Sequence, residues 1–88
     1  MPPERTLRDA PRVTVFTADH CGHCQRAKTF LREQGIAFRE LNVQRSRKAR
    51  QQFLRLNARG VPVILVGEKR LHGFHAATLR KLLKRAGC

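Results

Sequence analysis

The chain lacks tryptophan and tyrosine, and it has only six acidic residues among 88. Five phenylalanines are therefore its only aromatic side chains, and a small core must be built mainly from Val, Leu, Ile, Ala and Phe. The length suits one domain and leaves no room for a second. No apolar run approaches the roughly 18 to 20 residues needed to cross a bilayer, which excludes a membrane-spanning segment.

Cysteine is also scarce. The three cysteines are too few and too unevenly spaced for a secreted disulfide scaffold. Residues 1–12 contain no apolar run that resembles a signal peptide, so we expect a cytoplasmic protein. Residues 1–11 combine three prolines with four charges and predict a flexible leader before a single domain of residues 12–88.

Positive charge is abundant, because 19 Lys and Arg against six acidic residues give a net charge of +13. Such a field steers acidic partners and binds anionic surfaces without specificity. A basic stretch from Arg45 to Arg55 allows three interpretations: a solvated helix face, a docking site for an acidic protein or for the carboxylates of glutathione, and a nucleic-acid site. It has neither interleaved aromatic residues nor a known nucleic-acid motif, so we expect no specific nucleic-acid partner.

The motif Cys-Gly-His-Cys at residues 21–24 is the feature around which the chain is organised. Before it, residues 13–17 are β-branched and aromatic and predict a central strand. After it, Cys24 to Gln34 predict an amphipathic helix with Ala27, Phe30 and Leu31 inward and the charged residues, Lys28 among them, mostly on the other side. A helix N-terminus offers unpaired N–H groups and partial positive charge, which favour a thiolate over a thiol. The placement therefore predicts redox chemistry.

Other uses of the cysteines fit the sequence less well. Structural zinc needs two more ligands; Cys88 would have to come from the far end of the chain, and His20 and His23 lie too near the cysteines to complete the same tetrahedron. Haem attachment needs histidine directly after the second cysteine, where Gln25 stands. We expect no metal. Cys88 is expected to be an exposed thiol without a role, with glutathionylation or an intermolecular disulfide as alternatives.

The middle of the chain predicts a helix end, a strand and a second helix. Gly35 suits a left-handed helix cap, with Ile36 supplying the hydrophobic contact that accompanies such caps. A second strand is expected over about residues 37–43. Ser46 can N-cap a basic helix that ends near Asn57.

The last part of the chain predicts a hairpin and a final helix. Residues 61–66 and 70–71 form the hairpin, and its first strand begins at Pro62, where an unpaired backbone nitrogen is tolerated. Leucines at 79, 82 and 83 mark the helix. The expected fold is α/β, in the order β-α-β-α-β-β-α, with a four-stranded mixed sheet flanked by three helices.

Together these features resemble the thioredoxin superfamily and, within it, the small glutaredoxin-like proteins. The resemblance rests on the strand at 13–17, the motif at 21–24, Gly-Val-Pro at 60–62 and Leu-His-Gly-Phe at 71–74. It implies a thioredoxin-like fold and a thiol-disulfide oxidoreductase that reduces protein or glutathione mixed disulfides.

The resemblance also implies roles for individual residues. Cys21 matches the exposed attacking thiol of the family, and Cys24 matches its buried resolving thiol. Pro62 matches a proline that the family holds in a cis peptide bond facing the active site. The backbone of Val61 would pair with the substrate peptide or glutathione.

Further binding residues follow from the same comparison. Gly73 and Phe74 stand where the family has its glutathione-binding loop, and Arg59 is the basic residue expected nearest a bound thiol substrate. Residues 72–76 contain no carboxylate to hold the amino group of glutathione. Gly-Phe at 73–74 looks more like the redoxins that thioredoxin reductase reduces and that supply electrons to ribonucleotide reductase.

The pair between the cysteines departs from the glutaredoxin pattern. Gly22 and His23 form the pair better known from protein disulfide isomerases, where glutaredoxins usually have Pro and an aromatic residue. An imidazolium beside the thiolate would stabilise the reduced form and make the disulfide a stronger oxidant, so His23 is a candidate catalytic residue. Gly60 also stands where many glutaredoxins have Thr.

The preferred hypothesis is a monomeric cytoplasmic thiol-disulfide oxidoreductase without a bound cofactor. Its partners would be a disulfide-containing protein substrate and an electron source, either glutathione or thioredoxin reductase. A thiol oxidase or isomerase is the alternative that the Gly-His pair favours. A non-catalytic basic adaptor for an acidic partner is the alternative from a different class.

Overall fold

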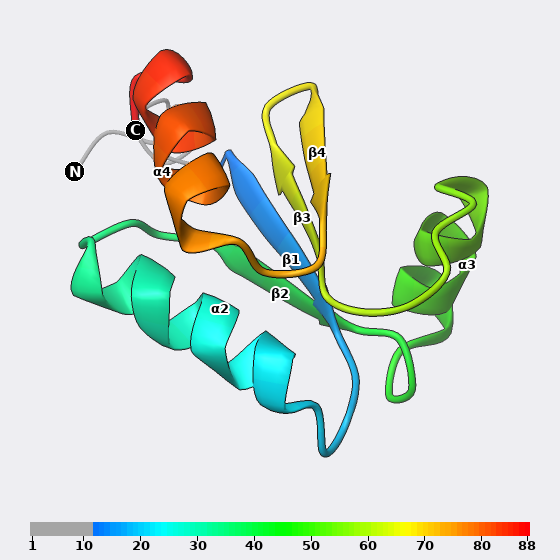
Figure 1. The fold of residues 1–88 in the computed structure, drawn as a ribbon. Helices are drawn as coiled ribbons and strands as arrows, with labels where there is room; N and C mark the ends of the chain where they lie inside the picture. The colour runs from blue at the N-terminus through cyan, green and yellow to red at the C-terminus, as the bar shows by residue number, and fades with distance from the viewer. Residues whose placement is uncertain (1–11) are drawn as a thin grey trace, which may run out of the picture.

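The computed structural model describes residues 12–88, so the predicted leader at 1–11 lies outside the described residues. The elements follow in the order that the sequence predicts, β-α-β-α-β-β-α (Figure 1). They are β1 (Val13–Thr17), α2 (Gly22–Glu33), β2 (Arg39–Asn42), α3 (Arg47–Arg55), β3 (Val63–Val66), β4 (Lys69–His72) and α4 (Ala76–Arg85). Along residues 12–88, no helix has both the length and the hydropathy of a membrane span.

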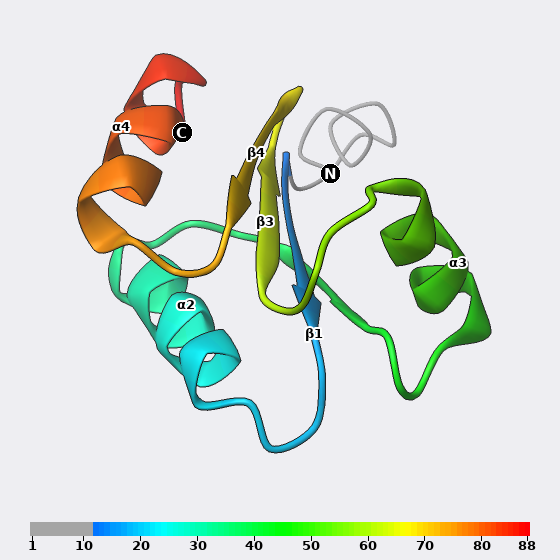
Figure 2. The same cartoon turned by 45° about the vertical axis from the view of Figure 1, so that its right-hand side comes forward.

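The four strands form one mixed sheet in the order β2-β1-β3-β4. β1 pairs in parallel with β2 and antiparallel with β3, and β3 and β4 form an antiparallel hairpin. Helices α2 and α4 cover one face of the sheet, and α3 lies on the other (Figures 1 and 2). This is the thioredoxin-like arrangement that the sequence predicts, and it leaves the carboxyl end of β1 open for a site.

The main core lies between the sheet and the pair α2 and α4. Its buried members come from β1, β3 and the inner faces of both helices: Val13, Val15, Ala27, Phe30, Leu31, Ile64, Val66, Leu79 and Leu83. On the other face, the ring of Phe16 packs against Phe53 of α3 with centroids 5.8 Å apart. β1 is thus apolar toward both layers, as expected for a central strand.

α2 begins at Gly22, two residues earlier than the Cys24 start predicted from the apolar periodicity. The reason is that Cys21 itself occupies the N-cap position, and its sulfur accepts a hydrogen bond from the N–H of Cys24 at 3.2 Å. Periodicity reveals only the turns that have an inward apolar residue, so it misses the first turn of this helix.

The far end of α2 is closed as predicted. Gly35 has a φ of 69°, in the left-handed region. Its N–H donates to the carbonyl of Arg32 at 3.0 Å, and the N–H of Ile36 donates to that of Leu31 at 2.9 Å. These two bonds make a Schellman cap, and Ile36 packs against the core beside it.

The remaining boundaries differ slightly from the predicted ones. β2 covers only Arg39–Asn42, because β1 begins at Val13 and the first parallel pair is Thr14 with Arg39. β3 starts at Val63 rather than at Pro62, since proline has no N–H for the ladder. Ser46 does cap α3, and its Oγ accepts from the N–H of Ala49 at 3.1 Å.

Candidate active site

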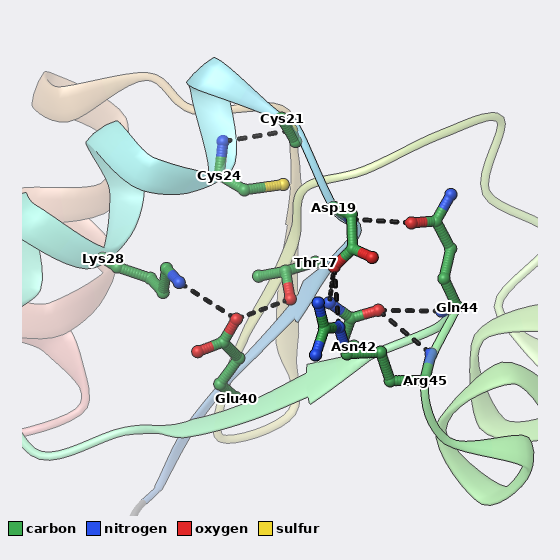
Figure 3. Close-up of polar contacts among 9 residues, drawn as sticks. All are labelled: Thr17, Asp19, Cys21, Cys24, Lys28, Glu40, Asn42, Gln44 and Arg45. Atoms are coloured by element: carbon green, nitrogen blue, oxygen red, sulfur yellow. Dashed lines mark hydrogen bonds and ion pairs between the residues drawn. The ribbon is translucent and has the colours of Figure 1, made fainter.

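The two motif cysteines lie where β1 ends and α2 begins. Cys21 is half-buried, and Cys24 is buried with 1% of its surface exposed. Both carry free thiols. In Figure 3 Cys21 lies just before α2 and Cys24 lies on its first turn, with the N–H of Cys24 directed at the sulfur of Cys21. One sulfur is therefore within reach of a partner, while the other can reach only its neighbour.

Burial raises the pKa of the Cys24 thiol to about 12, and its hydrogen bond with Cys21 acts in the same direction. The backbone of Ala18 and the positive charge of Lys28 oppose this shift. Cys24 is accordingly a neutral thiol near neutral pH, which suits a second nucleophile that acts only after the first has reacted.

A charged cluster lies beside Cys24, between α2 and the sheet (Figure 3). Nζ of Lys28 lies 3.0 Å from Oε2 of Glu40, and the hydroxyl of Thr17 donates to the same oxygen at 2.8 Å. Burial alone would raise the pKa of Glu40, but the bonds from Thr17 and Lys28 lower it overall. Lys28 was expected with the other charged residues on the outer side of α2. It is buried instead, because Glu40 is placed to pair with it.

A second polar cluster joins the loop before Cys21 to the loop after β2. Oδ1 of Asp19 accepts from Nε of Arg45 at 2.9 Å and from Nδ2 of Asn42 at 3.0 Å. The side-chain oxygen of Gln44 accepts from the N–H of Asp19 at 2.8 Å. Hydrogen bonds from Arg45 and Asn42 lower the pKa of the Asp19 carboxyl. Arg45 was predicted on the outer face of the basic helix, but it precedes α3 and steadies the loop that leads to the cysteines.

Two grooves contain residues of the candidate site. One, of about 510 Å³, is lined by residues that include His20, Gln25, Lys28 and Glu40. Another, of about 460 Å³, lies around the segment between α3 and β3 and the end of β4. A substrate chain that reaches Cys21 thus has two grooves into which it can extend, and the one lined by Lys28 and Glu40 is the more polar.

The second groove brings together three of the residues predicted to bind substrate, namely Arg59, Val61 and Gly73. The Val61–Pro62 peptide bond is cis, as the resemblance implied. The N–H of Gly73 donates to the carbonyl of Pro62 at 2.8 Å, which links the two segments directly.

Phe74 lies apart from that groove. Its ring packs against Phe30 of α2 with centroids 5.6 Å apart, and it lines a shallow apolar depression beside that helix. His23 is exposed on the first turn of α2, and Cys88 is exposed at the end of the chain. Within residues 12–88, no three side chains of His, Cys, Asp or Glu come together as metal ligands would.

Sequence reasoning missed the buried cluster of Lys28, Glu40 and Thr17. A signal was present, because Lys28 lies one helical turn after Cys24 and directly after the inward-facing Ala27. A charged residue within an apolar stripe is unusual, and it indicates a buried partner.

Comparison with known proteins shows which family the chain is similar to. A family model described as Glutaredoxin matches residues 13–71. The glutaredoxin-like protein NrdH of Lactococcus lactis is 31% identical over 70 residues, which are 80% of this chain and 97% of that protein. The glutaredoxin-like protein NrdH of Escherichia coli K12 is 27% identical over 71 residues, covering 81% of this chain and 88% of its own length.

Solved structures of similar proteins have the same fold. The thioredoxin-like protein BC3987 superimposes with a TM-score of 0.76 at 26% identity, covering 81% of this chain and 99% of that one. The NrdH-redoxin of Escherichia coli, whose structure is described as the basis of a thioredoxin-like activity profile, has a TM-score of 0.72 at 26% identity. It covers 80% of this chain and 92% of its own.

Proposed function

The chain belongs to the glutaredoxin family, and on this basis we propose that it reduces disulfides of protein substrates with the dithiol of Cys21 and Cys24. The observation that carries the proposal is the pairing of an accessible sulfur at the N-cap of α2 with a buried sulfur one turn further on. The first can attack a partner, and the second can only attack the first.

The reaction proceeds in two exchanges. The thiolate of Cys21 attacks one sulfur of the substrate disulfide; a bond forms between them, and the other substrate sulfur leaves as a thiolate that takes up a proton. Cys24 then loses its proton and attacks the sulfur of Cys21. The second substrate thiol departs, Cys21 and Cys24 are left as a disulfide, and the substrate has gained two electrons and two protons.

Ionisation of Cys24 is the demanding part of this sequence, because burial raises its pKa. The positive charge of Lys28 favours the thiolate form of Cys24, and the ion pair with Glu40 keeps that charge in place. The released proton is taken up by the departing substrate thiolate. Lys28 and Glu40 therefore act as positioning residues for the second exchange.

The substrate chain would lie over the segment that contains the cis proline. The backbone of Val61 pairs with an extended peptide, and Arg59 attracts the carboxylates of that peptide. Pro62 is itself buried, so it supports this segment from within. The N–H of Gly73 donates to the carbonyl of Pro62, and this bond holds the chain after β4 beside the segment that contains the proline. Phe74 lies outside the groove, and its packing on Phe30 fixes the chain that follows Gly73 against α2.

We infer that thioredoxin reductase, rather than glutathione, returns electrons to the dithiol. Residues 72–76 have no carboxylate to pair with the amino group of glutathione. The thioredoxin-like activity profile of the Escherichia coli relative supports the same direction.

Two cysteine variants test the function. Cys21→Ser should abolish turnover and form no covalent adduct, whereas Cys24→Ser should stop after the first exchange and accumulate a mixed disulfide, detected by non-reducing electrophoresis and mass spectrometry. Full disulfide reduction by Cys21→Ser would contradict the assignment.

The electron source is tested by supplying the wild type with either NADPH and thioredoxin reductase or NADPH, glutathione and glutathione reductase. NADPH consumption should be fast with the first system. Turnover with the second system alone would contradict the inferred reductant and leave the dithiol mechanism intact.

A further inference from the structure

Helix α3 lies on the face of the sheet opposite α2 (Figure 2). The helix and the loop before it line an open groove of about 550 Å³. We name it the α3 groove and define it by its lining residues, which are 43–47, 50, 53 and 54. The rest of the described protein covers little of α3, because Ala49 is the only buried residue of this helix. A face this open on a small domain suggests an external partner.

The groove combines positive charge with an apolar patch. Arg45, Arg47 and Arg50 line it, and neither its lining nor α3 contains an acidic residue. Leu54 lines the groove beside these arginines and is 62% exposed. Among the described residues, it is the large hydrophobic side chain that is exposed to solvent. A leucine presented to water among arginines is typical of a surface that contacts both charged and apolar groups.

The groove adjoins the active site through Arg45. That residue lines both the α3 groove and the groove that contains His20 and Gln25, the neighbours of the two cysteines. Its bond to Asp19 fixes the two loops together. A chain that lies in the α3 groove can therefore continue toward Cys21 over one connected surface.

We propose that the α3 groove docks an acidic segment of the protein substrate, with an apolar side chain of that segment resting on Phe53 and Leu54. The inference rests on the proposed function, because the docked protein is the one whose disulfide reaches Cys21. Arginines pair with the carboxylates and bring the partner in, and the apolar contact sets the register.

A nucleic acid fits this surface less well. Single strands stack their bases on exposed aromatic rings, and the ring of Phe53 is half-buried against Phe16. Binding through phosphates alone would follow the total charge of the protein and ignore Leu54. An acidic peptide with one apolar residue uses both features of the groove.

The test measures binding separately from chemistry. A fluorescent peptide of Glu and Asp around one Leu is titrated with the double variant Cys21→Ser/Cys24→Ser, which leaves the groove intact. In that background, Arg47→Glu/Arg50→Glu reverses two charges in the groove. Lys81→Glu/Lys84→Glu on α4 makes the same change in total charge on the other face of the sheet and is the matched control, since all four side chains are exposed.

We expect the groove variant to weaken binding about tenfold, and the α4 control to weaken it by about twofold or less. Leu54→Gln should weaken binding of the Leu peptide about threefold and leave a peptide with Ser in place of Leu unchanged. Equal losses in the groove variant and the α4 control would overturn the proposal. Tighter binding of a single-stranded oligonucleotide, or of vesicles with anionic lipid, to the same arginines would also overturn it.

Turnover of a small-molecule disulfide by the cysteine-intact protein separates this inference from the proposed function. Arg47→Glu/Arg50→Glu should retain that turnover and lose its preference for an acidic protein disulfide over a small one. If the wild type reduced no disulfide at all, the proposed function would be wrong, and the peptide-binding result would still be valid.

Discussion

Nζ of Lys28 and Oε2 of Glu40 lie 3.0 Å apart and join α2 to β2 one helical turn below Cys24. The side chain of Lys28 is only 11% exposed, which is unusual for a lysine. The pair therefore places a fixed positive charge beside a thiol whose burial opposes its ionisation.

Lys28→Met should slow the second exchange, because the pKa of Cys24 rises further when the nearby positive charge is removed. Each unit by which the pKa of Cys24 rises lowers its thiolate fraction about tenfold near neutral pH. We therefore expect the rate of the second exchange to fall roughly threefold to tenfold. Stopped-flow resolution of a preformed mixed disulfide, measured across pH, checks this. Lys28→Arg should restore the rate, and an unchanged pH profile in Lys28→Met would contradict the role.

Glu40 should contribute stability that disappears in acid. Its pKa in the folded protein lies below the ordinary value of 4.5, so the charged form stabilises the fold above that pH. The contribution is lost as pH falls through the lower folded value. The difference in unfolding free energy between wild type and Glu40→Gln, from urea titrations, should be larger at about pH 7 than at about pH 3. An equal difference at both would show that the carboxylate charge is irrelevant.

His23→Ala should make the disulfide harder to reduce. If the imidazole stabilises the reduced dithiol, its removal shifts the reduction potential to more negative values, by about 30 mV for each tenfold change in the equilibrium constant. Equilibration with defined glutathione or dithiothreitol buffers gives the potential. If a positive charge at this position is what stabilises the reduced dithiol, His23→Lys should have a potential close to that of the wild type. A wild-type potential as high as those of strong oxidants would favour the oxidase or isomerase alternative.

Gly35→Ala should destabilise the protein through its backbone alone. Nothing lies within 4 Å of a Cβ at this position, but the φ of 69° is unfavourable for alanine. We expect a cost of about 1 kcal/mol in thermal or chemical unfolding. Gly60→Ala is the control, because it has the same open space without the left-handed φ, and should change stability by less than about 0.5 kcal/mol.

Local signals explain why so much of the fold is visible in the sequence. The β-branched and aromatic run of β1, the periodicity of α2, the glycine cap at Gly35 and the N-cap at Ser46 all act within a few residues, and all are confirmed. The order of the elements, together with the Val-Pro after α3, then indicates the thioredoxin-like fold.

The polar clusters beside the cysteines depend on distant pairings and were not predicted. Glu40 meets Lys28 only because β2 pairs with β1 in the register that sets Thr17 opposite Asn42. The pairing of Asp19 with Arg45 likewise joins two loops that are 26 residues apart in sequence. Periodicity contains no information about register between strands, so these contacts require the structure.

The outer strand β4 carries Lys69 and Arg70 on an edge that no other strand of the described sheet covers. A second copy of the chain that approached this edge to extend the sheet would bring like charges opposite one another, which opposes pairing. Strand pairing between copies of the chain is therefore disfavoured at this edge. A small protein with an exposed strand edge can in this way oppose edge pairing without a helix or loop that covers the edge.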